Sequence, residues 1–231
     1  MSISVCLAVH NGERFLQTQM VSILSQLDPA DELLVSDDAS TDGSLMIITS
    51  FSDARLRLLP ARTFGNPNDN FEYLLGHCRH DYIFIADQDD VWHPDKRARM
   101  TSALQKADLV VSDCRIIDSA GAVIYPSYFS IRPPRPGVAA NVWRNSFTGC
   151  CMAFRKKVLE KALPFPAFGG IYDQWLGLVA ARYFTITFLA EALVDYRRHG
   201  NNFSSTTGTS KLSLGQQLMN RIRLMKILFR R

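Results

Sequence analysis

An alternation of short apolar runs and amphipathic stretches in the first half of the chain constrains the fold more than any other feature. The runs at residues 2–9 (SISVCLAV), 31–38 (DELLVSDD) and 82–86 (YIFIA) have the length and composition of buried strands. Strands that alternate with helices predict an α/β fold, with a central, mostly parallel sheet flanked by helices on both faces. The helix expected between the first two strands would bury one face, made of Leu16, Met20, Ile23, Leu24 and Leu27.

The remaining segments continue this pattern less regularly. We expect strands at residues 54–61 and 107–118 and helices at 40–51, 66–78 and 93–107, with Asn68 or Asp69 capping the second helix. Residues 130–146 are rich in proline and arginine and have no period, which predicts a long loop of the kind that often binds ligands. Residues 146–163 read as a strand that runs into a helix, and residues 185–202 as one or two short strands that end in a basic turn.

Composition narrows the class of protein without selecting a function. With 231 residues, of which 47% are hydrophobic and 21% charged, the chain can form one globular domain. Its formal net charge of +4 fits an anionic ligand or a membrane surface; a nucleic acid is disfavoured because basic and aromatic residues do not gather together. Five cysteines without metal spacing indicate buried, reduced thiols. No secretory signal and no apolar stretch suited to spanning a membrane is evident, so we expect a cytoplasmic protein.

Polar side chains follow three of the expected strands, at the point where each strand ends. They are His10 with Asn11, Asp37 with Asp38, and the turn from Asp87 to Asp90. In parallel α/β sheets ligands bind beyond the carboxyl ends of the strands, so we expect these groups to converge on one site.

The acidic turn after the run YIFIA carries Asp87, Asp89 and Asp90 within four residues. Carboxylates this close repel one another, and a divalent cation such as Mg²⁺ that also binds a diphosphate would offset the repulsion. The alternative is that Asp90 or Asp95 caps the helix expected after Pro94. That alternative explains one aspartate but not three.

Three further groups have both a functional and a structural interpretation. Asp38 can hold a pyrimidine or a ribose, or close an Asx-turn. Asp173 can be a general base, or the cap of the helix that starts beside it. The basic turn YRRHGNN can recognise phosphate through its arginines and His199, or be a solvated turn.

With these residues assembled, the chain resembles the inverting glycosyltransferase family 2, of GT-A fold, and within it the bacterial rhamnosyltransferase-like members. The pieces that carry the resemblance occur in the family's order over about residues 2–202 and include LLVSDDASTDGS, NFEYLL, YIFIADQDDVWHPDK, TGCCMAF, YDQWLGLVAA and YRRHGNN. The resemblance implies a single GT-A (Rossmann-like) domain over residues 1–204, with a nucleotide-binding half to about 115 and an acceptor-binding half after it.

The resemblance also implies roles for individual residues. Asp173 would be the catalytic general base, and Asp89, Asp90 and His199 would hold Mg²⁺ or Mn²⁺. The residues that would bind the nucleotide sugar are Ala8, His10, Glu13, Asp37, Asp38, Asn70, Asp87, Asp89, Arg197, Arg198 and His199. One departure concerns Tyr172, because relatives commonly carry a histidine there, which puts the support of Asp173 in doubt.

The implied reaction is an inverting, metal-assisted transfer of a sugar from a nucleoside diphosphate to an acceptor hydroxyl. The subgroup points to L-rhamnose from dTDP-L-rhamnose, and to an acceptor on a growing cell-surface glycan such as lipopolysaccharide O-antigen, free or lipid-linked. Two other classes stay open: a sugar-phosphate nucleotidylyltransferase, and a non-catalytic subunit that binds nucleotide sugars. The first would normally show a glycine-rich basic loop near its N-terminus, where AVHNGERF has one glycine and one arginine.

The last residues, 205–231, are expected to form a polar linker and then a basic amphipathic helix. Leu218, Ile222, Met225 and Phe229 would share one face of that helix. Such a helix can lie on an anionic membrane, here the cytoplasmic face of the inner membrane, or pack on protein. The sequence leaves this choice open.

Overall fold

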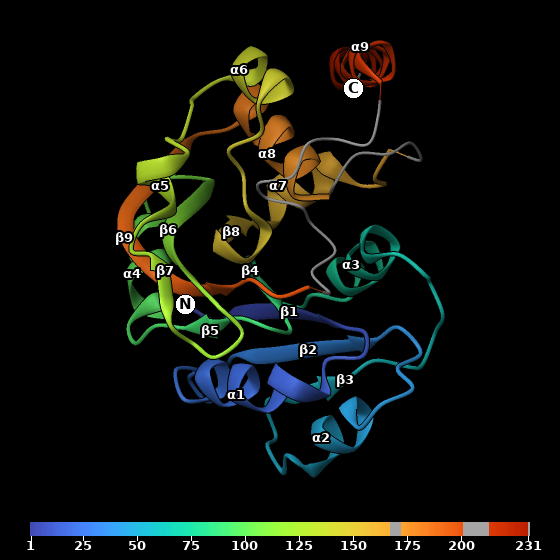
Figure 1. Cartoon of the computed structure of the whole chain (residues 1–231), viewed down its shortest axis with the longest axis vertical. Helices are drawn as coiled ribbons and strands as arrows, with labels where there is room; N and C mark the ends of the chain where they lie inside the picture. The colour runs from blue at the N-terminus through green and yellow to red at the C-terminus, as the bar shows by residue number, and fades with distance from the viewer. Residues whose placement is uncertain (167–171, 201–212, 231) are drawn as a thin grey trace.

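We describe a computed structural model of the chain over residues 1–166, 172–200 and 213–230 (Figure 1). Its described strands form one sheet in the order β3-β2-β1-β4-β8-β6-β9-β5, with β7 paired to β6. The strands are β1 Ile3–Val9, β2 Glu32–Asp37, β3 Leu56–Leu58, β4 Tyr82–Asp87, β5 Val91–Trp92, β6 Leu109–Ile117, β7 Val123–Tyr125, β8 Met152–Arg155 and β9 Ile186–Arg197. The helices are α1 Glu13–Leu24, α2 Ser44–Ser50, α3 Pro67–Gly76, α4 Lys96–Ala103, α5 Tyr128–Ile131, α6 Val138–Trp143, α7 Lys156–Ala162, α8 Tyr172–Tyr183 and α9 Leu214–Arg230.

The predicted parallel arrangement is confirmed in the first half of the chain. There the four adjacent strands β3, β2, β1 and β4 are parallel to one another. The second half is mixed, because β8 runs antiparallel to both β4 and β6, whereas β6 and β9 are parallel. The sheet then curls so that β9 pairs with the short β5, which directly follows the acidic turn. This curl brings the end of β9 back to the end of β4.

Each face of the sheet buries its own core. Along β1, Val5 and Leu7 pack with α1 and α4 on one face, whereas Cys6 between them packs with α3 on the other. Strands buried on both faces favour apolar residues at successive positions, which explains the apolar run from Val5 to Val9 in β1. In Figure 1, α1 and α2 lie on the opposite side of β1 and β2 from α3.

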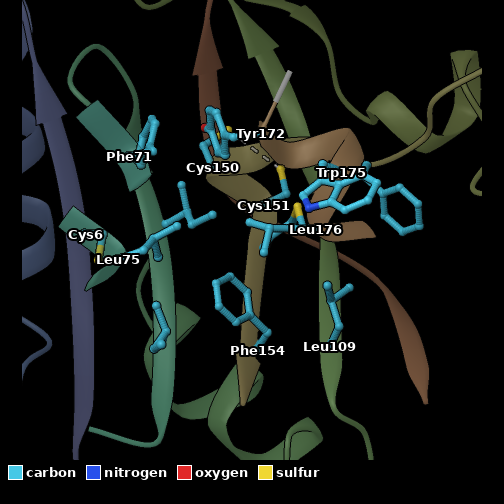
Figure 2. Close-up of a cluster of buried hydrophobic side chains, with 14 of the residues drawn as sticks. Cys6, Phe71, Leu75, Leu109, Cys150, Cys151, Phe154, Tyr172, Trp175 and Leu176 are labelled. Atoms are coloured by element: carbon cyan, nitrogen blue, oxygen red, sulfur yellow. Dashed lines mark hydrogen bonds between the residues drawn. The ribbon is translucent and has the colours of Figure 1, made fainter. Parts of the chain in front are cut away.

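The core on the α3 side also joins the two halves of the chain. Figure 2 shows Phe71 and Leu75 of α3 facing Tyr172 and Leu176 of α8 across β8. The indole Nε1 of Trp175 donates a hydrogen bond of 2.8 Å to the carbonyl of Ala162, so even the polar atom of this ring is paired. All five cysteines are buried and free, as the sequence predicted.

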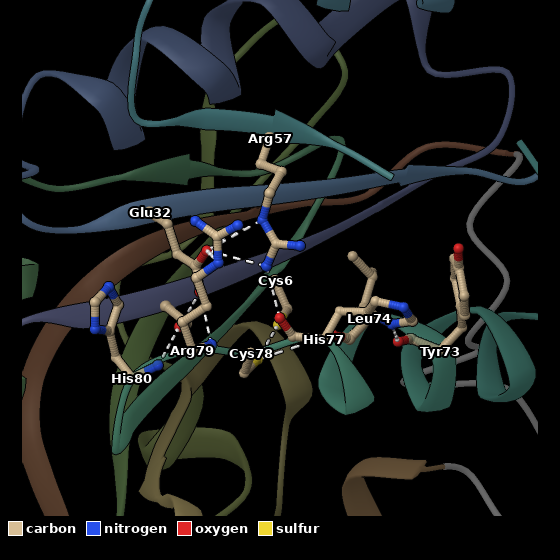
Figure 3. A network of polar contacts seen from close by, with 10 residues as sticks. Cys6, Glu32, Arg57, Tyr73, Leu74, His77, Cys78, Arg79 and His80 are labelled. Carbon is tan, nitrogen blue, oxygen red and sulfur yellow. Dashed lines mark hydrogen bonds and ion pairs between the residues drawn. The ribbon is translucent and has the colours of Figure 1, made fainter. Parts of the chain in front are cut away.

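A polar network connects the N-terminal ends of the parallel strands (Figure 3). Glu32, the first residue of β2, accepts hydrogen bonds from Ser4 Oγ, from Arg57 and from the backbone N–H of Arg79. Burial by itself would raise the pKa of Glu32, but these donors outweigh it and hold the pKa below the ordinary value. Arg57 also donates to the carbonyl of His77 at the end of α3, which fixes that helix to the sheet.

Several boundaries differ from the prediction, each for a local reason. Helix α3 begins at Pro67 and is capped by Asn66, whose side chain accepts the N–H of Asp69, so neither Asn68 nor Asp69 is the cap. The region predicted as one long loop contains α5 and α6, which are too short to show a period. Residues 186–197 form the single long strand β9, because its pairing with β6 continues through bulges.

The C-terminal helix α9 packs on the domain, with Leu224 and Leu228 in the α3-side core. The expected linker at residues 205–212 lies outside the described residues. Across the part of the chain that the structure describes, we find no helix that combines the length and the apolar character needed to cross a bilayer.

Packing between α8 and the loop before η1 (Gly149–Cys151) depends on Gly177. A Cβ atom on Gly177 would lie inside the van der Waals radius of the Phe147 ring. We expect Gly177→Ala to destabilise the protein by about 1–3 kcal/mol, because the ring must move within a filled core. Gly76→Ala is the matched control, since no atom lies within 4 Å of its Cβ position and helical Ala is favoured over Gly by up to about 1 kcal/mol. Urea denaturation measures both; equal stability of Gly177→Ala and wild type would contradict the packing argument.

Candidate functional site

The carboxyl ends of β2, β1 and β4 lie side by side and open into one pocket. The register pairs Val9 with Asp37 and Ala8 with Asp87, so the residues after each strand meet at the same edge. The pocket there has a volume of about 760 Å³. The predicted convergence of strand-end polar groups is therefore confirmed for His10, Asp38 and Asp87, which all line it.

Gln88, in the middle of the acidic turn, ties the end of β4 to the end of β1. Its Oε1 accepts the N–H of His10 at 2.8 Å, and its Nε2 donates to the carbonyl of His10 at 2.9 Å. A Cβ on Gly12 would lie 2.5 Å from Gln88 Oε1, so only glycine lets the chain pass this close. Sequence reasoning passed over Gln88, although its place between Asp87 and Asp89 was a usable signal.

The two aspartates after β2 have different tasks. Asp37 accepts the N–H of Ser40 at 3.0 Å, so it is Asp37 that closes the Asx-type turn suggested for Asp38. Asp38 reaches across to the segment before α3, where its carboxylate accepts the N–H groups of Phe64 at 2.5 Å and Gly65 at 3.0 Å. Asp38 thereby shapes one wall of the pocket while still lining it.

At the end of β9, His199 meets the acidic turn. Its Nε2 lies 2.7 Å from Oδ2 of Asp89, and both residues line the pocket. Arg197 stands behind them: its N–H donates to Asp90 Oδ1 at 2.9 Å and its Nε donates to the carbonyl of Asp89 at 2.9 Å. Arg197 and His199 of the basic turn are therefore structural partners of the acidic turn, whereas Asn201 and Asn202 lie outside the described residues.

The carboxyl groups of the acidic turn are crowded together and partly buried. Burial, then the charges of Asp89 and Asp173, raise the pKa of Asp87 to about 8. Burial, then Asp89 and Asp87, also raise the pKa of Asp90 well above its ordinary value. Oxygens of Asp87 and Asp90 and the sulfur of Cys150 lie within 4.8 Å of one another. Asp95 occupies the N-cap position of α4, but its side chain makes no capping hydrogen bond within the described residues, and Asp90 instead accepts the N–H of Arg197.

Asp173 enters the same pocket from the opposite half of the chain. It lies in the first turn of α8, and its carboxylate accepts the N–H groups of Gly149 at 3.2 Å and Gln174 at 2.5 Å. Burial raises its pKa to about 7, although these hydrogen bonds and the charge of Arg132 act in the other direction. A carboxyl group with this pKa can accept a proton near neutral pH.

The structure thus brings most, but not all, of the predicted site residues to the pocket surface. Those that line the pocket are Ala8, His10, Asp38, Asn70, Asp87, Asp89, Asp173 and His199. The other predicted residues, all within the described ranges, do not line it: Glu13, Asp37, Asp90, Arg197 and Arg198. Glu13, for example, accepts the N–H of Gly43 at 2.9 Å and so holds the start of α2.

Sequence reasoning did not single out the residues that line the pocket from the second half. Tyr128 and Arg132 come from α5 and the residue after it, and Asn145 and Phe147 follow α6. All four lie in or beside the proline- and arginine-rich region that was expected to bind ligands. Their individual roles were not visible because this region has no strand or long helix to set a register.

Two solved structures with a similar fold hold a nucleotide sugar or a nucleoside diphosphate. The chain aligns over 99% of its length with 65% of residues 1–349 of Staphylococcus aureus TarS in complex with UDP-GlcNAc, at a TM-score of 0.74 and 16% identity. It also aligns over 98% of its length with 79% of glucosyl-3-phosphoglycerate synthase from Mycobacterium tuberculosis, in complex with Mn²⁺ and UDP, at a TM-score of 0.61 and 19% identity. These likenesses confirm the predicted GT-A fold.

The chain is also similar in sequence to proteins described as glycosyltransferases. The chain is 36% identical over 97 residues to the dTDP-rhamnosyl transferase RfbG of Shigella flexneri, over 39% of this chain and 34% of RfbG. It is 28% identical over 226 residues to the uncharacterized glycosyltransferase alr2836 of Nostoc, over 91% of this chain and 70% of that protein. With the putative glycosyltransferase EpsE of Bacillus subtilis, 32% identity extends over 60% of this chain and 51% of EpsE.

One protein-family model matches most of the chain. The sequence model described as glycosyl transferase family 2 covers residues 4–163, which include the acidic turn and every parallel strand of the first half. This match favours a sugar transferase over a nucleotidylyltransferase. The chain therefore belongs to glycosyl transferase family 2.

Proposed function

We propose that the protein is an inverting, metal-assisted glycosyltransferase that moves a sugar from a nucleoside diphosphate to an acceptor hydroxyl. The observation that carries this proposal is the meeting of two sets of groups in one pocket. Asp87, Asp89 and His199 stand at the end of β4, and the buried carboxyl of Asp173 enters from α8. The first set suits a diphosphate and a cation, and the second suits removal of a proton.

The donor nucleotide would occupy the part of the pocket lined by the first half. Ala8 and His10 line it at the end of β1, and Asp38 and Asn70 line it toward α3. The Oδ1 atom of Asn70 is buried and has no hydrogen-bond partner among the described residues, so it can accept an N–H or O–H from the nucleotide. The predicted residues that do not line the pocket would act indirectly, by holding the residues that touch the donor. They are Glu13, Asp37, Arg197 and Arg198.

The residues at the acidic turn fit a divalent cation. Asp89 and His199, whose oxygen and nitrogen now share a hydrogen bond of 2.7 Å, would both be ligands of the cation, and its charge would also lower the cost of charging Asp87. Bound Mg²⁺ or Mn²⁺ supplies Lewis-acid stabilisation of the leaving diphosphate. Asp90, which is 1% exposed, lies behind Asp89; its role as a ligand stays a prediction.

Asp173 would activate the acceptor. The hydrogen bonds from Gly149 and Gln174 fix the carboxylate, so its free lone pairs face the pocket. The base takes the proton of the acceptor hydroxyl while the oxygen attacks the anomeric carbon and the diphosphate leaves. A single displacement of this kind inverts the anomeric carbon.

For the donor we propose dTDP-L-rhamnose, and for the acceptor a growing cell-surface glycan. The support is the 36% identity with part of RfbG, a dTDP-rhamnosyl transferase. The enzyme would act in the cytoplasm, at the face of the membrane where such glycans are assembled.

A donor panel tests the proposed reaction and separates it from a non-catalytic binding subunit. We expect dTDP-L-rhamnose to bind more tightly than UDP- or GDP-sugars by calorimetry, to be hydrolysed slowly by the pure protein, and to need Mg²⁺ or Mn²⁺. Asp89→Asn should lose most of the metal-dependent part of binding, because its side chain lies against His199. Asp28→Asn, at a carboxylate that is 63% exposed and does not line the pocket, is the matched control. Undiminished binding and turnover in a chelator would contradict the metal assignment, and binding without any turnover would favour the non-catalytic alternative.

Asp173→Asn separates catalysis from donor binding. The amide keeps an oxygen that can accept the Gly149 N–H, but it cannot take a proton. We expect transfer to fall by about 10²- to 10⁴-fold while the dissociation constant of the donor changes little. Radiolabelled transfer and calorimetry on one preparation measure both quantities. Normal turnover by this variant would remove Asp173 from the mechanism.

The pH dependence follows from the raised pKa of Asp173, about 7 in the folded protein against an ordinary value of 3.8. Transfer requires the deprotonated base, so kcat/KM should rise about tenfold per pH unit below pH 7 and level off above it. The free energy of unfolding changes with pH in the opposite direction to the activity. The contribution of Asp173 to stability is full below its unfolded pKa of 3.8 and is lost as pH rises through about 7. Asp173→Asn should flatten part of the fall in melting temperature between about pH 4 and pH 7. An unchanged slope would contradict the assigned pKa.

A further inference from the structure

Helix α9 has three stripes of residues with the same spacing, and they face three different environments. Gln217, Arg221, Leu224 and Leu228 form the stripe that packs on the domain, where Leu224 and Leu228 are buried. Tyr183 Oη donates to the carbonyl of Leu228 at 3.3 Å, and Arg221 donates to the carbonyl of Trp143 at 3.1 Å. The helix is therefore docked on the protein at a defined rotation, and its other two stripes face outward.

The next stripe is apolar although it faces outward; we call it the outer strip and define it as Leu218, Ile222, Met225 and Phe229. Leu218 is 51% exposed, Ile222 42% and Phe229 52%. These are the residues predicted to share one face, and the docked helix buries a different one. Four large apolar side chains in a row on a surface helix mark a contact surface.

The third stripe is basic and borders the outer strip along its whole length. It consists of Arg223, Lys226 and Arg230, all exposed, together with Met219. Four of the 26 Lys and Arg residues of the chain lie on α9, which has none of the 22 Asp and Glu residues. The rest of the chain therefore carries equal numbers of each sign, and the entire positive net charge corresponds to this helix.

On its other side the outer strip is bordered by Trp143, at the end of α6. The Trp143 ring is 66% exposed, and the Arg221 guanidinium lies 4.3 Å above its centre. Phe229 is flanked in the same way by Arg182 of α8, at 3.8 Å. An apolar strip between an exposed tryptophan and a row of cations has the composition of segments that lie at a lipid–water interface.

We propose that the outer strip, with Trp143 and the basic stripe, is a surface that binds an anionic lipid membrane. The apolar side chains and the Trp143 ring enter the boundary between headgroups and acyl chains, and Arg223, Lys226 and Arg230 contact anionic headgroups. A second copy of the chain is the less suitable occupant, because pairing two outer strips would bring two rows of like charge together. This inference concerns a surface outside the pocket and does not rest on the proposed donor or acceptor.

The docked helix also fixes which part of the enzyme faces the lipid. Helix α9 packs on α6, and the residues that follow α6, Asn145 and Phe147, line the second half of the pocket. A membrane bound at the outer strip therefore contacts the same half of the chain that supplies Asn145 and Phe147 to the pocket. The orientation is set by packing of α9 rather than by a tether.

Vesicle flotation tests the proposal with the full chain. We expect binding to vesicles of phosphatidylglycerol and phosphatidylcholine, little binding to phosphatidylcholine alone, and a marked loss between about 0.05 and 0.5 M salt. Ile222→Glu should weaken partitioning by about tenfold or more. Arg223→Gln, Lys226→Gln and Arg230→Gln should each weaken it about fivefold. Met46→Glu, at a 71% exposed apolar residue on α2, is the matched control and should bind like wild type.

Tryptophan fluorescence gives a second readout that does not depend on the charge variants. Of the three tryptophans, Trp92 and Trp175 are 3% and 1% exposed, so Trp143 alone is placed to respond to lipid. Anionic vesicles should shift the emission of wild type to the blue and brominated lipids should quench it, whereas Trp143→Phe should show neither change. Near-ultraviolet circular dichroism checks that each variant is folded.

Three results would overturn the proposal. The first is the absence of binding by folded wild type to anionic vesicles at low salt. The second is equal binding by wild type and Ile222→Glu. The third is a wild-type dimer that Ile222→Glu converts to a monomer, which would make a second copy the occupant of the strip. None of these results depends on sugar transfer, so failure here is distinguishable from failure of the proposed reaction.

Discussion

Like charges held together at the carboxyl end of β4 are the constraint around which the rest of the site is arranged. Asp87, Asp89 and Asp90 stand within one turn, and burial raises the pKa of Asp87 to about 8. Three neighbouring groups interact with these carboxyl groups. His199 lies against Asp89, the backbone N–H of Arg197 donates to Asp90, and the buried ammonium of Lys96 interacts electrostatically with Asp87 and Asp90. Such an arrangement is costly without a ligand, which is why it reads as a place where a cation and a diphosphate bind.

Topology supplies the partners of this turn from distant parts of the chain. Strand β9 runs parallel to β6 and then pairs with β5, so its last residues return to the acidic turn. Strand β8 inserts between β4 and β6, and the turn just before it presents the Gly149 N–H to Asp173. The position of β8 next to β4 thus helps to bring Asp173, our proposed general base, to the same pocket as the acidic turn.

The sequence predicted those parts of the site that lie at strand ends. His10, Asp38 and Asp87 follow runs whose apolar character marks them as strands, and parallel pairing then leaves little choice of position. It did not predict what depends on contacts between distant loops. Asp38 holds Phe64 and Gly65, and Glu13 holds Gly43, yet nothing in their local sequence shows these partners. Tyr128 and Arg132 escaped notice because a four-residue helix has no periodic pattern.

The buried ammonium of Lys96 has a consequence for how the molecule folds. Its Nζ donates to the carbonyl of Cys150 at 2.6 Å and lies 4.4 Å from the centre of the Trp92 ring, with no exposure to water. A charge can be buried there only when the acidic turn and the segment around residue 150 are both in place. The buried Lys96 therefore links α4, in the first half of the chain, to the segment before β8, in the second half, so we expect these two parts to form together.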